Sequence, residues 1–331
     1  MQAAVRMVEL WRAGRLESSH NGHAVICDGA GDVVARWGDP AAVIYPRSAC
    51  KMIQALPLVE SGAALAAGLT PRHLALACAS HQGAALHRGL VDDWLTGLGM
   101  READLRCGAH EPYDRPERNR LIRADERPCQ IHNNCSGKHA GFLTLNRQLK
   151  GGAEYIDADH PVQRAVREAF EDVTQETSPG FGIDGCSAPN CATSLAGLAR
   201  AMAFFAVAAS GSDRRATAAH ALTRAMTAHP DLVAGEGRAC TELMQAMGGK
   251  VAIKTGAEGV FVAIIPEKRI GIALKIIDGH ARAAECAIAA LLVRAGVLDA
   301  DHPATRKRLN AVQTNWRGLQ VAVLQTAAGF P

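Results

Sequence analysis

The sequence predicts an α/β protein of the α+β type, with a mainly antiparallel sheet flanked by helices and a separate helical lobe. Three observations support this prediction. Strand patterns occur at both ends of the 331-residue chain, helical patterns fill its middle, and turn clusters separate the segments. We place the sheet domain in residues 1–45 and 248–331 and the helical lobe in residues 46–247.

The N-terminal strands come first. Residues 6–11 alternate in polarity, residues 22–27 form a short apolar run, and residues 33–37 resume the strand pattern. Residues 28–32 read Asp-Gly-Ala-Gly-Asp, which is typical of a turn. The last two strands are therefore predicted to form a hairpin.

Helical patterns begin after Pro46. Turn clusters such as Gly151-Gly152 and residues 178–180 separate them. The predicted helices cover residues 48–61, 71–79, 86–98, 161–175, 194–209, 212–228 and 238–247.

The strand pattern returns after residue 249. Residues 251–256 predict one strand, and residues 260–278 predict two more, joined by a turn at residues 266–269. Residues 281–295 predict a helix that ends at Gly296. Residues 321–326 fit either a strand or a loop.

Charge and hydropathy exclude several classes of protein. The net charge is only +3, and the most basic stretch, around residues 115–123, is interleaved with acidic residues, so we expect a solvated face and no nucleic-acid partner. The most apolar helical stretch, residues 195–210, is too short to span a membrane and carries Arg200. The N-terminus lacks a signal-peptide pattern, so we expect a cytoplasmic protein with free thiols.

Ser48 and Lys51 form a Ser-x-x-Lys motif at the start of a predicted helix. Residues three apart share one helix face, so the amine can reach the hydroxyl. The unpaired N–H groups of a first helical turn can also stabilise an oxyanion. Taken alone, the motif is better explained by a serine that caps a helix.

Lys254, Thr255 and Gly256 form a second motif at the end of a predicted strand. A Lys-Thr-Gly strand is the third element of the serine β-lactamases and penicillin-binding proteins. Ser-x-x-Lys opening the first helix and Lys-Thr-Gly opening the returning sheet together predict a serine β-lactamase-like fold. Ser80, in a Gly-containing loop, is the candidate for the middle serine of that fold, although an ordinary loop serine fits as well.

Two polar segments carry cysteines. Residues 132–139 read HNNCSGKH and residues 184–191 read DGCSAPNC, a composition too polar for a core. Soft thiolates in such segments can hold zinc. No paired Cys-x-x-Cys occurs, so the spacing alone favours buried or incidental thiols over a zinc site.

These segments together resemble the L-asparaginase II family, the Rhizobium-type or class 3 L-asparaginases. The resemblance runs from about residue 7 to residue 295. It is carried by YPRSACKMIQALPLVESGAA (45–64), LACASHQG (76–83), HNNCSGKHAGFL (132–143), GIDGCSAPN (182–190) and KTGAEGVFVAIIPEKRIGIALKI (254–276).

The resemblance implies hydrolysis of L-asparagine to L-aspartate and ammonia by a homodimer of β-lactamase- and glutaminase-like fold. It implies that Ser48 is the nucleophile with Lys51 beside it, and that Ser80 and Lys254 form a second Ser-Lys pair. It also implies a zinc ion held by Cys135, Lys138 and Cys186. Positions near the family's site are occupied here by Arg47, His139, Asp184 and Cys240.

The chemistry follows from these residues. Lysine acts as a base only after losing its proton, which burial and a second nearby ammonium both favour. We therefore expect a lysine to take the proton of Ser48 as the hydroxyl attacks the side-chain amide. A glutaminase or another serine amidohydrolase of the same fold is the alternative enzyme. A β-lactamase is a further one, and a non-catalytic zinc or small-molecule sensor is the alternative outside enzymes.

Overall fold

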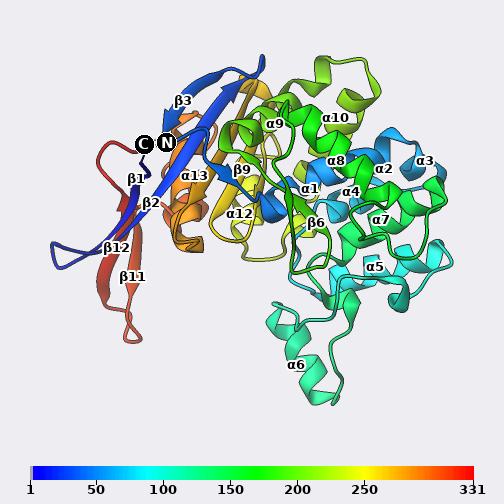
Figure 1. Ribbon diagram of the computed structural model, residues 1–331. Helices are drawn as coiled ribbons and strands as arrows, with labels where there is room; N and C mark the ends of the chain where they lie inside the picture. Colours follow the sequence, from blue (N-terminus) through cyan, green and yellow to red (C-terminus); the bar gives the residue numbers. More distant parts are fainter. Residues whose placement is uncertain (1–2) are drawn as a thin grey trace. The chain divides into compact units, whose positions relative to one another are not determined.

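The computed structural model describes residues 3–331, which divide into two compact units (Figure 1). The sheet unit contains the N-terminal residues through Ala49, Thr193–Val207 and Glu242–Pro331. The helical unit contains Cys50–Ala192 and Ala208–Thr241. Each unit is therefore assembled from segments that are distant in the sequence.

The sheet unit is built on one antiparallel sheet, with the strand order β11-β12-β1-β2-β10-β9-β8 and β3 paired to β2. This confirms the predicted antiparallel sheet and the hairpin at residues 28–32. Residues 321–326, which fit either a strand or a loop, belong to strand β12. Strand β11 was not predicted. The strands of this unit are β1 (Val5–Arg12), β2 (Arg15–Asp28), β3 (Val33–Trp37), β4 (Val43–Ile44), β7 (Thr193–Ser194), β8 (Ala252–Thr255), β9 (Val260–Ile265), β10 (Ile270–Ile276), β11 (Ala311–Thr314) and β12 (Gln320–Thr326).

Two helices pack on this sheet, α9 (Leu195–Val207) and α13 (Ala281–Arg294). All six residues of β9 are buried, which requires cover on both faces of the sheet. Helix α9 packs so closely on β10 that a Cβ atom at Gly271 would lie 2.1 Å from the Ala203 nitrogen. Helix α9 belongs to the sheet unit, whereas the sequence analysis placed residues 194–209 in the helical lobe. The unit also contains η5 (Pro266–Lys268) and α14 (Pro303–Arg306).

The helical unit contains most of the other predicted helices, with ends within about two residues of those expected. Its elements are α1 (Lys51–Gln54), α2 (Leu56–Glu60), α3 (Ala63–Ala66), α4 (Pro71–Ala77), α5 (Ala85–Gly97), η2 (Glu102–Asp104), α6 (Arg115–Arg123), η3 (Gln130–His132), α7 (Ser136–Leu149), α8 (Pro161–Thr174), β5 (Phe181–Ile183), β6 (Pro189–Cys191), η4 (Ala208–Ser210), α10 (Arg214–Ala228) and α11 (Pro230–Val233). Elements η1 (Arg47–Cys50) and α12 (Ala239–Ala246) run from one unit into the other.

Two expectations, one about a helix and one about burial, were wrong. The predicted helix at residues 48–61 is broken into η1, α1 and α2, and Pro57, which lacks a backbone N–H, opens α2. Ser48 therefore lies in a 3₁₀ turn and not in the first turn of an α-helix. Residues 132–139, predicted to be too polar for a core, are almost all buried and lead into α7.

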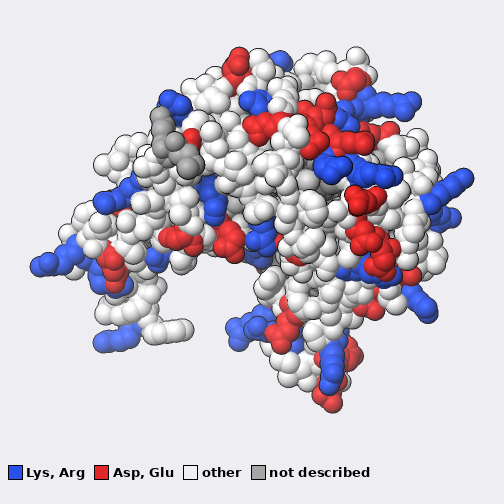
Figure 2. All heavy atoms as spheres, viewed as in Figure 1, with Lys and Arg blue, Asp and Glu red and all other residues white. Residues whose placement is uncertain are grey.

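The surface charges are mixed in sign. On the face that Figure 2 shows, basic and acidic side chains are interspersed. Within residues 3–331, no single helix is long and apolar enough to cross a bilayer. The bent pair of helices at residues 195–210 and 214–228 has the length and composition of a membrane span, and this comparison rests on length and composition only. Since α9 is mostly buried against the sheet, its apolar composition is accounted for by that packing.

We predict that Gly271→Ala destabilises the protein, because the new methyl group overlaps backbone atoms of α9 that cannot move independently. The free energy of unfolding should fall by about 2–3 kcal/mol in urea titrations. The matched control is Gly89→Ala in α5, where a Cβ atom meets nothing within 4 Å and helix propensity improves. Equal stabilities of the two variants would contradict the close packing of α9 on β10.

Candidate functional site

The amine of Lys51 lies at the centre of the helical unit's polar core. The side chain is 1% exposed, and Nζ donates to the Ala79 carbonyl oxygen, to Ser80 Oγ at 3.1 Å and to Cys135 Sγ at 3.2 Å. The three partners come from two segments that lie far along the chain from α1. A buried amine with polar partners beside a serine hydroxyl is the arrangement that a proton transfer requires.

Two backbone hydrogen bonds hold the segment that carries Ser80. Ser80 N donates to the Val233 carbonyl oxygen at 2.9 Å, and His81 N donates to that of Asn134 at 3.2 Å. The amine that contacts Ser80 within the helical unit is that of Lys51. The predicted pairing of Ser80 with Lys254 stays a prediction.

Two buried thiols approach the second lysine of this unit. Lys138 Nζ lies 3.0 Å from Cys186 Sγ, and the Cys135 and Cys186 thiols interact with each other. Cys135 occupies the N-cap position of α7 without a capping hydrogen bond from its side chain. Gly137 allows the helix to begin here, because a Cβ atom at this position would lie 2.5 Å from the Leu76 carbonyl oxygen. The structure therefore brings together the three residues expected to hold zinc.

Charge is distributed unequally over this cluster. The hydrogen bond with Cys186, together with burial, raises the pKa of the Cys135 thiol well above its ordinary value. The same hydrogen bond lowers the pKa of Cys186 well below it, although burial opposes this shift. Burial disfavours the Lys138 ammonium, but the two thiols outweigh burial and raise its pKa. A thiolate at Cys186 is thus held beside an ammonium at Lys138.

His139 follows in the same helix and is fully buried. Its Nδ1 lies 2.8 Å from the Tyr155 hydroxyl, a residue that the sequence analysis did not single out. Burial lowers the pKa of His139 to about 4, although Cys186 opposes the shift. Its Nε2 is buried and lacks a hydrogen-bond partner of standard geometry among the described residues. Tyr155 sits in a polar stretch with no motif around it, so only the folded structure reveals it.

The donor set of this cluster suits a soft metal ion. Two thiols and one amine lie close together out of bulk water, and thiolate is a preferred ligand of zinc. Within residues 3–331, no group of three or more Cys, His, Asp and Glu side chains is arranged to hold a metal. A metal here therefore depends on lysine as a ligand.

The other predicted Ser-Lys residues lie in the sheet unit. Ser48 is half-buried in η1, next to Arg47, whose φ of 53° is the left-handed conformation that side chains rarely adopt. Lys254 is 1% exposed in β8. A Cβ atom at Gly256 would lie 2.5 Å from the Pro46 carbonyl oxygen, so the Lys-Thr-Gly strand packs directly against the turn that carries Ser48.

The two remaining candidates lie elsewhere in the helical unit. Asp184 lies in the tight turn between β5 and β6, where its backbone N–H bonds the Ala188 carbonyl oxygen and its carboxylate accepts from the Gly185 N–H. This turn presents Cys186 to Lys138. Cys240 is buried in α12.

The sequence pattern of the L-asparaginase II family matches residues 8–326, nearly the whole chain. The chain belongs to the L-asparaginase II family. This membership confirms the resemblance carried by the segments quoted above. No curated protein sequence shows a significant match to it.

Solved structures of other proteins are more distant. The protein Mglu, in its tris and glutamate form, is 13% identical, with 85% of this chain and 60% of Mglu covered and a TM-score of 0.46. The native form of Mglu is 14% identical, with 85% of this chain and 66% of that one covered and a TM-score of 0.45. A β-lactamase from Mycobacterium bovis is 13% identical, with 84% of this chain and 95% of that one covered and a TM-score of 0.37. This chain thus spans 60–66% of the length of the Mglu structures it matches.

Two histidines border the Ser80 segment of this L-asparaginase II family member. The rings of His81 and His87 are stacked, with 4.8 Å between their centroids, and His81 Nε2 lies 3.0 Å from Ser136 Oγ. Burial, and secondarily His87, lowers the pKa of His81 well below 6.5, and burial lowers that of His87. Both rings are therefore neutral in the folded protein under conditions where an unfolded chain takes up protons.

We predict that the folded state loses stability as the pH falls below 6.5. The stabilising contribution of the neutral rings of His81 and His87 is complete above the pKa that histidine has in the unfolded chain. It is lost as the pH decreases toward the lower pKa values that the two rings have in the folded protein. Each histidine should change the free energy of unfolding by about 1.4 kcal/mol per pH unit in this window. Urea titrations between pH 6.5 and 5.5 should show a smaller slope for His81→Asn. Parallel slopes would contradict the neutral pair.

Proposed function

We propose that the protein is an L-asparaginase that hydrolyses L-asparagine to L-aspartate and ammonia. Membership of the L-asparaginase II family over residues 8–326 carries this proposal. The buried Lys51 amine beside Ser80 supports it, because an amide hydrolase that acts through a hydroxyl needs a nearby group to take up its proton.

In the proposed mechanism, Ser48 is the nucleophile. Its Oγ attacks the side-chain amide carbon of asparagine while Lys51 accepts the hydroxyl proton. The backbone N–H of Ser48 donates to the oxyanion that forms. The strained backbone at Arg47 supports a functional role for this turn, since such conformations cluster at active sites.

Ammonia leaves next. Its nitrogen takes a proton delivered through Ser80 or Lys51, and this step leaves a β-aspartyl ester on Ser48. Water then hydrolyses the ester and releases aspartate. Lys254 completes the second Ser-Lys pair with Ser80, while Arg47, His139, Asp184 and Cys240 contribute to the substrate site.

We further propose that Cys135, Lys138 and Cys186 hold a zinc ion. The mutual contacts of these side chains and their burial support this assignment. Lysine is a rare zinc ligand because it must lose its proton first, so zinc affinity should increase with pH. When bound, the ion supplies a Lewis acid that orients the α-amino or α-carboxylate group of the substrate. We also propose a homodimer, on the basis of the resemblance to the family, and a cytoplasmic location.

The first test is ammonia release by the purified protein from L-asparagine, with L-glutamine as the matched amide. We expect release from asparagine at a higher kcat/KM than from glutamine. Release from glutamine alone would assign a glutaminase instead. No release from either amide by folded protein would favour another amide substrate first and the sensor alternative after it.

Ser48→Ala should lower kcat by at least about a thousandfold, because the hydroxyl that forms the ester is removed. Ser80→Ala is the matched control and should retain an acyl-enzyme burst at a lower rate. Mass spectrometry of the trapped ester identifies the acylated serine. An ester on Ser80 would reverse the roles of the two serines.

The zinc assignment predicts one zinc ion per chain by elemental analysis of protein purified without chelator. Cys186→Ser should lose this zinc, because a thiolate ligand is replaced by a weaker hydroxyl. Cys240→Ser, at a buried cysteine outside the proposed ligand set, should retain it. Equal metal content in the two variants would sink the assignment independently of any effect on activity.

A further inference from the structure

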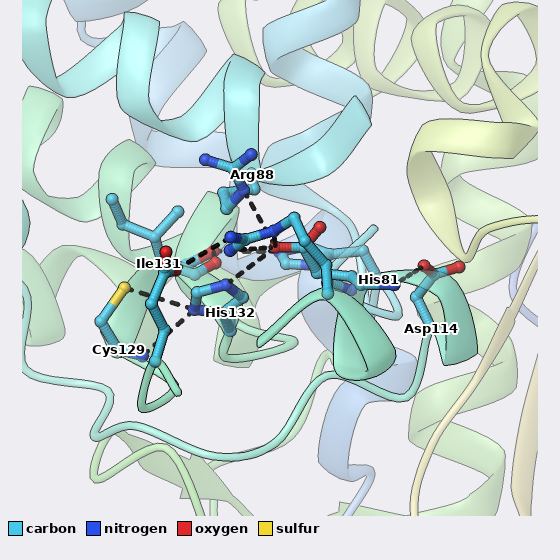
Figure 3. Close-up of polar contacts among 11 residues, drawn as sticks. His81, Arg88, Asp114, Cys129, Ile131 and His132 are labelled. Carbon is cyan, nitrogen blue, oxygen red and sulfur yellow. Dashed lines mark hydrogen bonds and ion pairs between the residues drawn. The ribbon is translucent and has the colours of Figure 1, made fainter. Parts of the chain in front are cut away.

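A second cluster of reactive groups lies in the helical unit and takes no part in the proposed hydrolysis (Figure 3). Cys129 Sγ lies 3.3 Å from Nδ1 of His132, and Nε2 of the same ring lies 3.4 Å from Glu117 Oε1. Cysteine, histidine and carboxylate thus form a line in which each ring nitrogen faces one partner. This is the order of nucleophile, base and orienting group.

The hydrogen bonds of His132 define the roles of its two nitrogens. The Glu117 carboxylate only accepts, so the neutral ring carries its proton on Nε2. Nδ1 then carries a single lone pair, which faces both the backbone N–H of Cys129 at 3.1 Å and the Cys129 sulfur at 3.3 Å. It takes the thiol proton in exchange for the hydrogen bond from the backbone N–H.

Glu117 is held in its charged form by two arginines. Its side chain is 4% exposed, Arg120 Nη2 lies 2.9 Å from Oε1, and Arg88 Nε lies 3.3 Å from the same oxygen. Burial alone raises the pKa of this carboxyl, but the arginines outweigh burial and lower it. The carboxylate therefore stays anionic and supports an imidazolium at His132 once the thiol proton has moved.

Cys129 is also accessible, unlike most thiols of the chain. All ten cysteines lie within the described residues, and only Cys129 and Cys191 are not buried. The hydrogen bond with His132 lowers the pKa of Cys129, whereas burial raises that of Cys191. The two partly exposed thiols therefore differ in the feature that controls thiol reactivity, a base in contact with the sulfur.

We propose that Cys129 is a covalent modification site that reacts with small disulfides. His132, oriented by Glu117, takes the thiol proton and so generates the reacting thiolate. The thiolate attacks one sulfur of the disulfide, and a new sulfur–sulfur bond forms as the original one breaks. The leaving thiolate takes the proton that His132 received from Cys129. The net reaction converts one thiol and one disulfide into a mixed disulfide and one free thiol, with no other oxidant.

The test exposes the full-length protein to glutathione disulfide and follows the mass of the intact chain over time. The expected product is one added glutathione per chain, located on Cys129 by peptide mapping. Cys129→Ser should abolish this fast addition, and Cys191→Ser, at the other partly exposed thiol, should leave it unchanged. First addition at Cys191, or equal rates at both residues, would overturn the proposal.

The pH dependence tests the role of the base. Cys129 faces His132 and Glu102, while His132 also faces Glu117, with Arg88 and Arg120 behind that carboxylate. His132→Gln should slow addition about threefold to tenfold near pH 7, and the two proteins should react at similar rates above about pH 9.5, where ordinary thiols are ionised. A His132→Gln variant that reacts as fast as the wild-type protein at both pH values would contradict the activation of Cys129 by His132.

A control for folding is built into the wild-type protein. Addition of iodoacetamide to the wild-type chain needs no variant, and Cys129 should be labelled ahead of Cys191 near pH 7 and lose its lead as the pH rises. An unchanged ratio of the two labels across this range would refute a base beside Cys129 even if every His132 variant failed to fold.

Discussion

The buried amine of Lys51 is the interaction on which the helical unit depends. A lysine ammonium has three N–H donors, and burying it costs several kcal/mol unless acceptors replace water. Here the Ala79 carbonyl, the Ser80 hydroxyl and the Cys135 sulfur supply those acceptors. Because they come from separate segments, the position of α1 defines both the Ser80 segment and the start of α7. The amine thus contacts both the serine and the thiol cluster.

Close packing of glycines complements this polar constraint. Gly137 brings α7 against the backbone of α4, Gly256 brings β8 against the Ser48 turn, and Gly271 brings α9 onto the sheet. At each position, a methyl group would overlap backbone atoms that cannot rotate away. The first two glycines belong to the same motifs as the proposed catalytic and zinc residues. The glycine of such a motif thus places the segment, while its polar neighbours supply the chemistry.

Much of the fold could be predicted from the sequence because its signals are local. Alternation and turn residues identified the hairpin at residues 28–32 and strands β8 to β10. Non-local contacts explain what was missed. The sequence shows the spacing of Ser48 and Lys51, but it cannot show that the Lys51 amine bonds Ser80, 29 residues away. Similarly, the polar composition of residues 132–139 indicated exposure, because the partners that satisfy those side chains lie elsewhere in the chain.

Cysteines within one short stretch have different chemistry because of what surrounds them. Cys129 is partly exposed and faces a histidine, the proposed base. Cys135 is buried and faces Lys51 and Cys186, which suits a ligand set closed to solvent. Exchanging the two environments would defeat both roles, since a thiolate without access to solvent meets no disulfide, and an open ligand set lets water and other thiols compete for the metal. Burial therefore keeps the proposed metal chemistry separate from the proposed thiol chemistry within this segment.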